Sequence, residues 1–163
     1  MSHPVSVEVQ LASAASPLPD RQYVADCVQA TFDFVQQQTG SSVEIVVRIV
    51  DDDESRDLNS RFRQTDKPTN VLAFPSYDAD LAELFEEAGE FPLGDLVICA
   101  PVVLREATEQ GKNADDHWAH ILVHGTLHLL GYDHVEAEEA ARMEALETRI
   151  LAARGIGDPY RDR

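Results

Sequence analysis

The sequence predicts a single domain of the α/β (α+β) class, in which a mixed sheet of about four strands packs with helices. The 163 residues suit one domain, expected to span residues 1–163, and a hydrophobic content of 44% is enough for a core without disulfide bonds. Segments with the two-residue alternation of strands interchange with segments of helical periodicity, in the order β-α-β-α-β-β-α-α-α. This order indicates a sheet with helices packed on it.

Two strands and two helices are expected in the first part of the chain. Residues 5–11 alternate valine or leucine with polar residues, as half-buried strands do, and a helix is expected from about Pro19 until Gly40. Residues 43–50 are β-branched almost throughout and form the second expected strand. The helix that follows ends near Arg63 and begins with acidic residues, which suit the positive end of its dipole.

Two further strands are expected on either side of an acidic segment. Residues 71–75 form a short expected strand, residues 76–94 an acidic loop, and residues 95–99 another strand. The strands at 43–50 and 71–75 are joined across a short helix. We expect them to form a parallel, right-handed crossover.

Three helices are expected to complete the domain. Pro101 suits the first position of a helix that ends near Gln110, and Asn113 suits the cap of a long helix that carries four histidines. After Gly131, residues 136–153 have the apolar periodicity of a last amphipathic helix.

The most informative segment is residues 124–134, His-Gly-Thr-Leu-His-Leu-Leu-Gly-Tyr-Asp-His. His124 and His128 are four residues apart and therefore share one face of a helix. Gly131 suits the end of that helix, because glycine enters the left-handed conformation without steric cost, and the turn lets His134 return toward the other two. These three imidazoles predict a site for one divalent metal ion with an open coordination position. Such an ion can activate water or polarise a phosphoryl or carbonyl oxygen.

The same histidine spacing occurs in metzincin proteases, with one difference. Those enzymes place a glutamate, their general base, directly after the first histidine, whereas this chain has Gly125. The metal site is therefore expected without the peptidase base.

Charge is distributed unevenly along the chain. The formal net charge of −17 argues against a general nucleic-acid binder, since phosphate contacts need lysine and arginine. A basic island nevertheless stands out, and it consists of Arg56, Arg61, Arg63 and Lys67. Chemically, Arg63 suits either a phosphate oxygen or an ordinary ion pair at the end of a helix.

The cysteines and the apolar segments bear on the compartment. Cys27 and Cys99 lie far apart in apolar contexts and are expected to be buried free thiols, as in a reducing cytosol. No signal-peptide pattern is evident, and the longest apolar run, residues 96–104, is too short to span a bilayer. We therefore expect a cytoplasmic protein that does not enter a membrane.

Two motifs carry a resemblance to a known family. Residues 58–75, which include Pro-Thr-Asn-Val-Leu-Ala-Phe-Pro, together with residues 124–134 closely resemble the YbeY family of bacterial metal-dependent endoribonucleases. Residues 94–99 and the His-Trp-Ala-His segment at 117–120 extend the resemblance over most of the chain beyond residue 40. The first strand and helix match only in pattern.

The resemblance implies a function and roles for particular residues. It implies hydrolysis of single-stranded rRNA during 3′-end maturation of the small-subunit (16S) rRNA and in ribosome quality control. The implied metal is zinc on His124, His128 and His134, and Arg63 and His124 are the expected catalytic residues. Arg63 and Lys67 are expected to bind the substrate. The expected partners are the small ribosomal subunit and its associated proteins, with no DNA.

Some alternatives stay open at the level of sequence. The chain can also be a ribosome-assembly factor that binds without cutting, with a structural metal, or a metallopeptidase of an unusual type. His117 and His120 suit supporting or wall positions better than a fourth ligand position. Asp133 suits a turn as well as a functional role.

Overall fold

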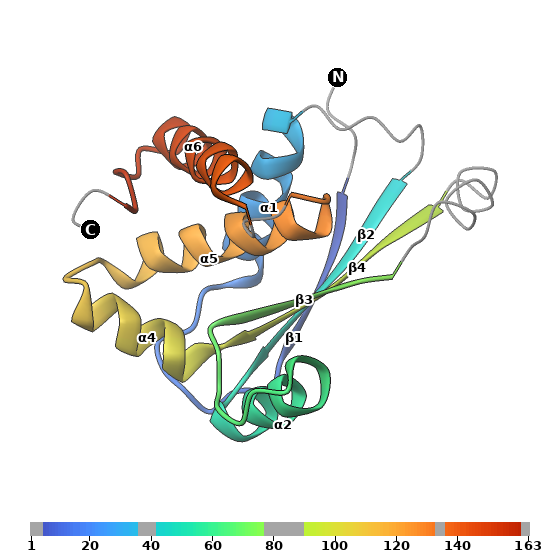
Figure 1. The fold of residues 1–163 in the computed structure, drawn as a ribbon, viewed down its shortest axis with the longest axis vertical. Coiled ribbons are helices and arrows are strands. Elements are labelled where there is room, and N and C mark those ends of the chain that lie inside the picture. The colour runs from blue at the N-terminus through green and yellow to red at the C-terminus, as the bar shows by residue number, and fades with distance from the viewer. Residues whose placement is uncertain (1–4, 36–41, 77–89, 133–135, 161–163) are drawn as a thin grey trace.

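A four-stranded mixed sheet runs through the centre of the molecule, with helices on both of its faces (Figure 1). The computed structural model describes residues 5–35, 42–76, 90–132 and 136–160. The strands are β1 (Val5–Leu11), β2 (Ser42–Val50), β3 (Val71–Pro75) and β4 (Glu90–Cys99). The helices are α1 (Arg21–Val35), α2 (Asp52–Arg63), α4 (Ala100–Glu109), α5 (Ala114–Leu129) and α6 (Ala137–Ala153). These elements confirm the predicted α+β class and its mixed sheet.

The strand order corrects one prediction. The sheet has the order β1-β2-β4-β3, in which β1, β2 and β4 are parallel and β3 is antiparallel to β4. The expected parallel crossover from the strand at 43–50 to the strand at 71–75 is therefore wrong, because β4 lies between them. Leu96, Val97, Ile98 and Cys99 are all buried although they alternate between the two faces, as suits a central strand. The short β3 forms the edge.

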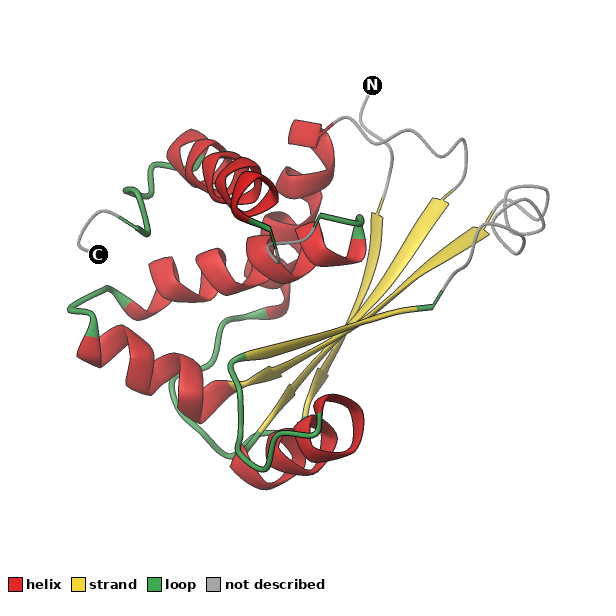
Figure 2. Ribbon diagram, in the orientation of Figure 1, coloured by secondary structure: helices red, strands yellow, loops and turns green. Residues whose placement is uncertain are grey.

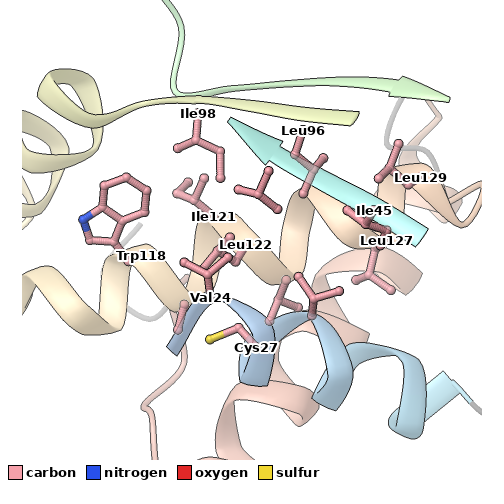
Figure 3. Close-up of a cluster of buried hydrophobic side chains, with 14 of the residues drawn as sticks. Val24, Cys27, Ile45, Leu96, Ile98, Trp118, Ile121, Leu122, Leu127 and Leu129 are labelled. Carbon is pink, nitrogen blue, oxygen red and sulfur yellow. The ribbon is translucent and has the colours of Figure 1, made fainter. Parts of the chain in front are cut away.

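Most of the core lies between the sheet and helices α1, α5 and α6 (Figure 2). Strand residues such as Ile45, Leu96 and Ile98 meet Leu122 of α5 and Val24 of α1 there (Figure 3). Their burial removes apolar surface from water and fixes α5 across the sheet. Because α5 carries the histidines, this packing positions the candidate site.

A smaller apolar cluster lies on the opposite face, beneath α2. It consists of buried Val50, Leu72, Val97 and Cys99, with Leu58 of α2 and Phe74 of β3 packed against it. Both cysteines are buried free thiols, as expected. Helix α5 packs on one face of the sheet and α2 on the other, so the two helices lie on opposite sides of the edge strand β3.

The boundaries of α2, α4, α5 and α6 agree closely with the predictions, while the expected end of the first helix at Gly40 lies outside the described residues. Asn113 caps α5 as expected, since its side-chain oxygen accepts a hydrogen bond from the Asp115 amide at 2.8 Å. The strand expected at 95–99 begins earlier, at Glu90. Most of the expected acidic loop at 76–94 lies outside the described residues. In the described part of the chain, no helix combines the length and apolarity that a membrane span requires.

Candidate metal centre

Four histidines of α5 form a row along one stripe of the helix. The ring centroids are 5.9 Å apart for His117 and His120, 6.2 Å for His120 and His124, and 4.6 Å for His124 and His128. The stripe follows from spacings of three and four residues, which return to the same helix face. Within the row, His124 and His128 lie closest together.

The ring nitrogens of His124 and His128 converge. Their Nε2 atoms are 3.1 Å apart, and both residues line a pocket of about 660 Å³. Two imidazoles on a tetrahedral zinc ion, with bonds of about 2.0–2.1 Å, would have nitrogens roughly 3.3 Å apart. The donor pair therefore fits a metal ion. The third predicted ligand, His134, lies outside the described residues, as does Asp133.

A buried acid contacts the other side of His124. The Nδ1–H of His124 donates a hydrogen bond to Oε1 of Glu147, and the hydroxyl of Tyr160 donates to Oε2. Nε2 of His120 lies 3.2 Å from the Tyr160 hydroxyl and 3.5 Å from Glu147. Burial opposes the ionisation of Glu147, but hydrogen bonds from His120, His124 and Tyr160 outweigh it and lower the pKa of Glu147 to about 2. Glu147 is therefore a carboxylate that accepts only.

Glu147 also belongs to a group that can hold a metal ion. One ligand atom each of His120, His124 and Glu147 lies within 4.8 Å of the other two. His124 thus stands between two possible donor sets. Its Nδ1 faces Glu147 and the protein interior, whereas its Nε2 faces His128.

His117 is part of a separate polar contact. Its Nε2–H donates to Oε1 of Glu106 at 2.9 Å, and the side-chain amide of Asn70 donates to the same carboxylate at 3.2 Å. Burial raises the pKa of Glu106, but these hydrogen bonds outweigh it and the pKa is lowered. Asn70 lines the pocket that contains His124. His117 therefore supports the pocket wall indirectly, through its hydrogen bond to Glu106, which in turn contacts Asn70.

Helix α2 and strand β3 form the other side of the pocket. Asn59 and Arg63 line it from α2, and Val71 to Ala73 with Pro75 line it from β3. Asn59 is buried and donates to the carbonyl oxygen of Lys67 at 2.8 Å, which ties α2 to the following loop. Lys67 is exposed in that loop and is not among the described residues that line the pocket.

The arginines of the basic island differ in their partners. Arg56 pairs with Asp66 at 2.8 Å, and Arg61 pairs with Asp57 at 3.3 Å. Arg63 instead donates from Nη2 to the carbonyl oxygen of Ala73 at 3.4 Å, and it forms no ion pair within the described part of the chain. Among the described residues, the contact of Arg63 is therefore one with a backbone carbonyl oxygen and not the ion pair that was the alternative.

Gly131 ends α5 in the predicted manner. Its φ is 97°, its amide donates to the carbonyl oxygen of His128, and the Tyr132 amide donates to that of Leu127, both at 3.0 Å. This pair of bonds is the Schellman motif, which needs a left-handed residue at the position of Gly131. The helix end and the positive φ at Gly131 agree with the sequence prediction, while the expected return of His134 lies outside the described residues.

Close packing against the sheet explains why residue 125 is a glycine. A Cβ atom there would lie 2.9 Å from Cδ2 of Leu96 and 3.2 Å from Cγ2 of Val71. The side of α5 that carries Gly125 therefore lies directly on the sheet. A glutamate at this position would have to enter that contact, which is consistent with the absence of the peptidase base.

Two residues of the site were not predicted from the sequence. Glu147 is fully buried on the stripe of α6 that also contains Met143, Ile150 and Leu151. An acid within an apolar stripe is a signal that could have revealed it. Tyr160 follows the last helix without any periodic pattern, so the sequence held no comparable signal for it.

The fold and the pocket define a class of protein: a single-domain α+β protein with a histidine-based candidate metal centre at the end of one helix. The family model described as Endoribonuclease YbeY matches residues 10–155. The chain belongs to this family, as the resemblance of its motifs indicated.

Curated relatives agree with this assignment. The chain is 55% identical over 154 residues to Endoribonuclease YbeY of Halorhodospira halophila (strain DSM 244 / SL1), covering 94% of each chain. It is 48% identical to Endoribonuclease YbeY of Cellvibrio japonicus (strain Ueda107), covering 94% of this chain and 82% of that protein. A solution structure of a protein from Thermotoga maritima has the same fold, with a TM-score of 0.54 at 21% identity, covering 94% of this chain and 99% of that one.

Proposed function

We propose that this chain is a metal-dependent endoribonuclease that hydrolyses single-stranded RNA and matures the 3′ end of 16S rRNA. One observation carries the proposal: His124, His128 and Arg63 line the same pocket of about 660 Å³. A metal ion and a guanidinium beside one cavity suit the charge that develops on a phosphoryl group. Membership of a family described as endoribonucleases supports the same reaction class.

The proposed metal is one zinc ion held by His124, His128 and His134. The 3.1 Å separation of the two Nε2 atoms supports the first two ligands, and the turn at Gly131 supports the return of the chain toward them. When bound, the ion would supply a Lewis acid that activates water for attack on phosphorus. His124 takes part in catalysis through this site.

Arg63 is proposed to bind and stabilise the phosphoryl group. A guanidinium presents parallel N–H donors that match two phosphate oxygens. Arg56 and Arg61 are neutralised by nearby aspartates, whereas Arg63 contacts a carbonyl oxygen and keeps its charge available to the pocket. Lys67, exposed in the next loop, is proposed to attract the RNA backbone outside the pocket.

The partners and location follow from the same proposal. The substrate would be rRNA in the small ribosomal subunit of the cytoplasm, together with proteins associated with that subunit. A chain with a net charge of −17 repels RNA at long range, so contact with a ribosomal protein would help to bring it to the substrate.

An assay of RNA cleavage tests the proposal. Zinc-loaded protein should cut a labelled single-stranded RNA internally, and a duplex of the same sequence should resist. A chelator or the variant His124→Ala should abolish cleavage. If the chelated protein or the His124→Ala variant cuts the RNA as fast as the zinc-loaded wild type, the reaction does not depend on a metal at this pocket.

A further inference from the structure

Glu147 is a charged group in an apolar setting. Its side chain is 0% exposed, and its helix neighbours Met143, Ile150 and Leu151 are buried as well. A carboxylate in such a position is costly unless hydrogen bonds satisfy it. An apolar side chain would fill the same space in the core without the cost of burying a charge. The function of Glu147 therefore has to be sought in its hydrogen bonds.

Those contacts come from distant parts of the chain. His124 donates from Nδ1 on α5, and Tyr160 donates its hydroxyl from the segment after α6. His120 approaches both, with its Nε2 atom 3.2 Å from the tyrosine oxygen and 3.5 Å from the carboxylate. Since a carboxylate accepts only, the proton of neutral His124 must be on Nδ1, and its Nε2 carries the lone pair.

We infer that Glu147 is a positioning residue that holds His124 in the Nδ1–H tautomer and directs its Nε2 toward the metal. The hydrogen bond from the Tyr160 hydroxyl fixes the Glu147 carboxylate in place. The inference rests on the metal site of the proposed function. His120, His124 and Glu147 are then a supporting group behind the metal. A carboxylate behind a ligating imidazole fixes the orientation of the ring and makes it a better ligand.

The test combines the tautomer with metal affinity. Long-range proton–nitrogen NMR of the metal-free protein should show His124 of the wild type protonated at Nδ1, and Glu147→Gln should weaken that preference. Competition with a chromogenic chelator should show zinc binding about ten- to a hundredfold weaker in Glu147→Gln. Tyr160→Phe should produce a smaller loss. Glu139→Gln makes the same chemical change at an exposed position in the first turn of α6 and should have no effect.

Different outcomes separate the inference from the proposed function. An unchanged tautomer and unchanged zinc affinity in Glu147→Gln would overturn the inference. Loss of zinc in His120→Ala but not in His128→Ala would also overturn it, since the metal would then lie on the other donor set. If Glu147→Gln does not fold, Tyr160→Phe decides by the same two readouts. Wild-type protein that binds zinc but cuts no RNA would contradict the proposed function alone.

A different observation, at the end of α2, carries a second inference. Phe62 is 57% exposed, and Leu11 is the other large hydrophobic side chain exposed among the described residues. The Phe62 ring stands edge-on to the Phe74 ring of β3, with centroids 5.2 Å apart and planes at 72°. Its neighbour Arg63 reaches the carbonyl oxygen of Ala73 on the same strand. Two consecutive residues of α2 thus contact consecutive residues of β3: the Arg63 guanidinium lies in the lining of the pocket, and the exposed Phe62 ring lies outside it.

We propose that Phe62 stacks on an unpaired nucleobase of the RNA whose phosphate Arg63 binds. This proposal rests on the proposed function. Every base offers a π-face, so stacking tolerates any sequence, but the face must be free of its neighbours. A base within a duplex is stacked on both sides. The contact would therefore favour single-stranded RNA.

The test uses a single-stranded 2′-O-methyl oligonucleotide, which resists cleavage. Phe62→Ala should weaken binding roughly five- to 150-fold, whereas Phe62→Trp should retain it and report binding by fluorescence quenching. Leu11→Ala is the matched control, because Leu11 is 44% exposed on β1 at the opposite edge of the sheet. Abasic substitutions along the oligonucleotide should identify one position that weakens wild-type binding but not that of Phe62→Ala.

Binding by Phe62→Ala equal to that of wild type would overturn the stacking proposal. The proposal would also fail if the abasic substitution that weakens wild-type binding weakened the binding of Phe62→Ala by the same factor. If wild-type protein cuts no single-stranded RNA at all, the proposed function fails instead, whatever the effect of Phe62.

Discussion

Arg63 and His124 come from helices on opposite faces of the sheet, yet they line the same pocket. The two side chains can line one pocket because β3 is a short strand at the edge of the sheet, and Arg63 at the end of α2 extends past this edge. Arg63 is held by a carbonyl oxygen and His124 by a carboxylate. The two groups that would act on a phosphodiester are therefore fixed by separate contacts.

Arg63→Ala should abolish most RNA cleavage without changing the fold or the metal content. Removal of one preorganised contact to the reacting group typically costs about a hundred- to a thousandfold in rate. Arg63→Lys should recover only part of the activity, because an ammonium lacks the planar fork. Cleavage rates at saturating RNA measure this directly. Arg61→Ala, which breaks an exposed pair with Asp57, is the control and should stay close to wild type.

His128→Ala should remove most of the bound metal. The Nε2 atom of His128 is one of the two nitrogens that converge at 3.1 Å, so its loss leaves the proposed site with fewer than three imidazoles. Elemental analysis of the purified variant gives the stoichiometry. Metal retained at the wild-type ratio would exclude His128 as a ligand.

At the scale of single residues, local spacing predicted part of the site. His124 and His128 could be paired from the sequence because residues four apart share a helix face. Glu147 is 23 residues from His124, and only the packing of α6 on α5 brings them together. Arg63 could be recognised as unusual by charge, but its contact with Ala73 depends on where β3 lies.

At the scale of elements, the turn after α5 is a structural requirement of the proposed site. Gly131→Val should weaken metal binding without removing a ligand. A Cβ atom at Gly131 would meet nothing within 4 Å, so the cost is purely conformational, at a φ of 97°. A β-branched residue there should cost about 1–3 kcal/mol or force the turn to open.

Gly131→Asn provides the matched control for this turn. Asparagine tolerates the left-handed region better than other residues with a side chain, so it should preserve most of the zinc affinity. Chelator competition compares the two variants. Equal affinity for zinc in the valine and asparagine variants would show that the turn does not control the site.

The close contact between α5 and the sheet leads to a prediction for Gly125. Gly125→Glu should destabilise the protein by more than about 3 kcal/mol and should not create peptidase activity, because the side chain must enter the contact with Leu96 and Val71. Gly125→Ala should lose less, since the Leu96 methyl group can move. Thermal unfolding measures both. A glutamate variant as stable as wild type would mean that α5 can move away from the sheet.

The elements themselves were largely predictable, whereas their arrangement was not. Apolar alternation identified the strands at 5–11 and 43–50 because a half-buried strand imposes it. The same pattern reports which side of a strand is buried, but it does not report which strand lies next to it. The insertion of β4 between β2 and β3 therefore had to come from the structure.

At the scale of the whole molecule, the distribution of charge has to be reconciled with an RNA substrate. The net charge of −17 repels a polyanion, while the proposed metal and Arg63 would provide positive charge at one pocket. Such an arrangement disfavours binding to RNA in general and favours a substrate presented at that pocket. A ribosomal partner would provide this presentation.

The central claim is that the histidine pocket cuts rRNA, and mapping of 16S rRNA 3′ ends in cells tests it most directly. A bacterial strain that lacks its own family member would carry this chain or its His124→Ala or Arg63→Ala variant, each at equal protein levels. The account predicts mature 3′ ends with the wild-type chain and accumulated immature ends with both variants. Mature 3′ ends in cells that carry only His124→Ala would contradict it, because the protein would then act without the pocket that defines it.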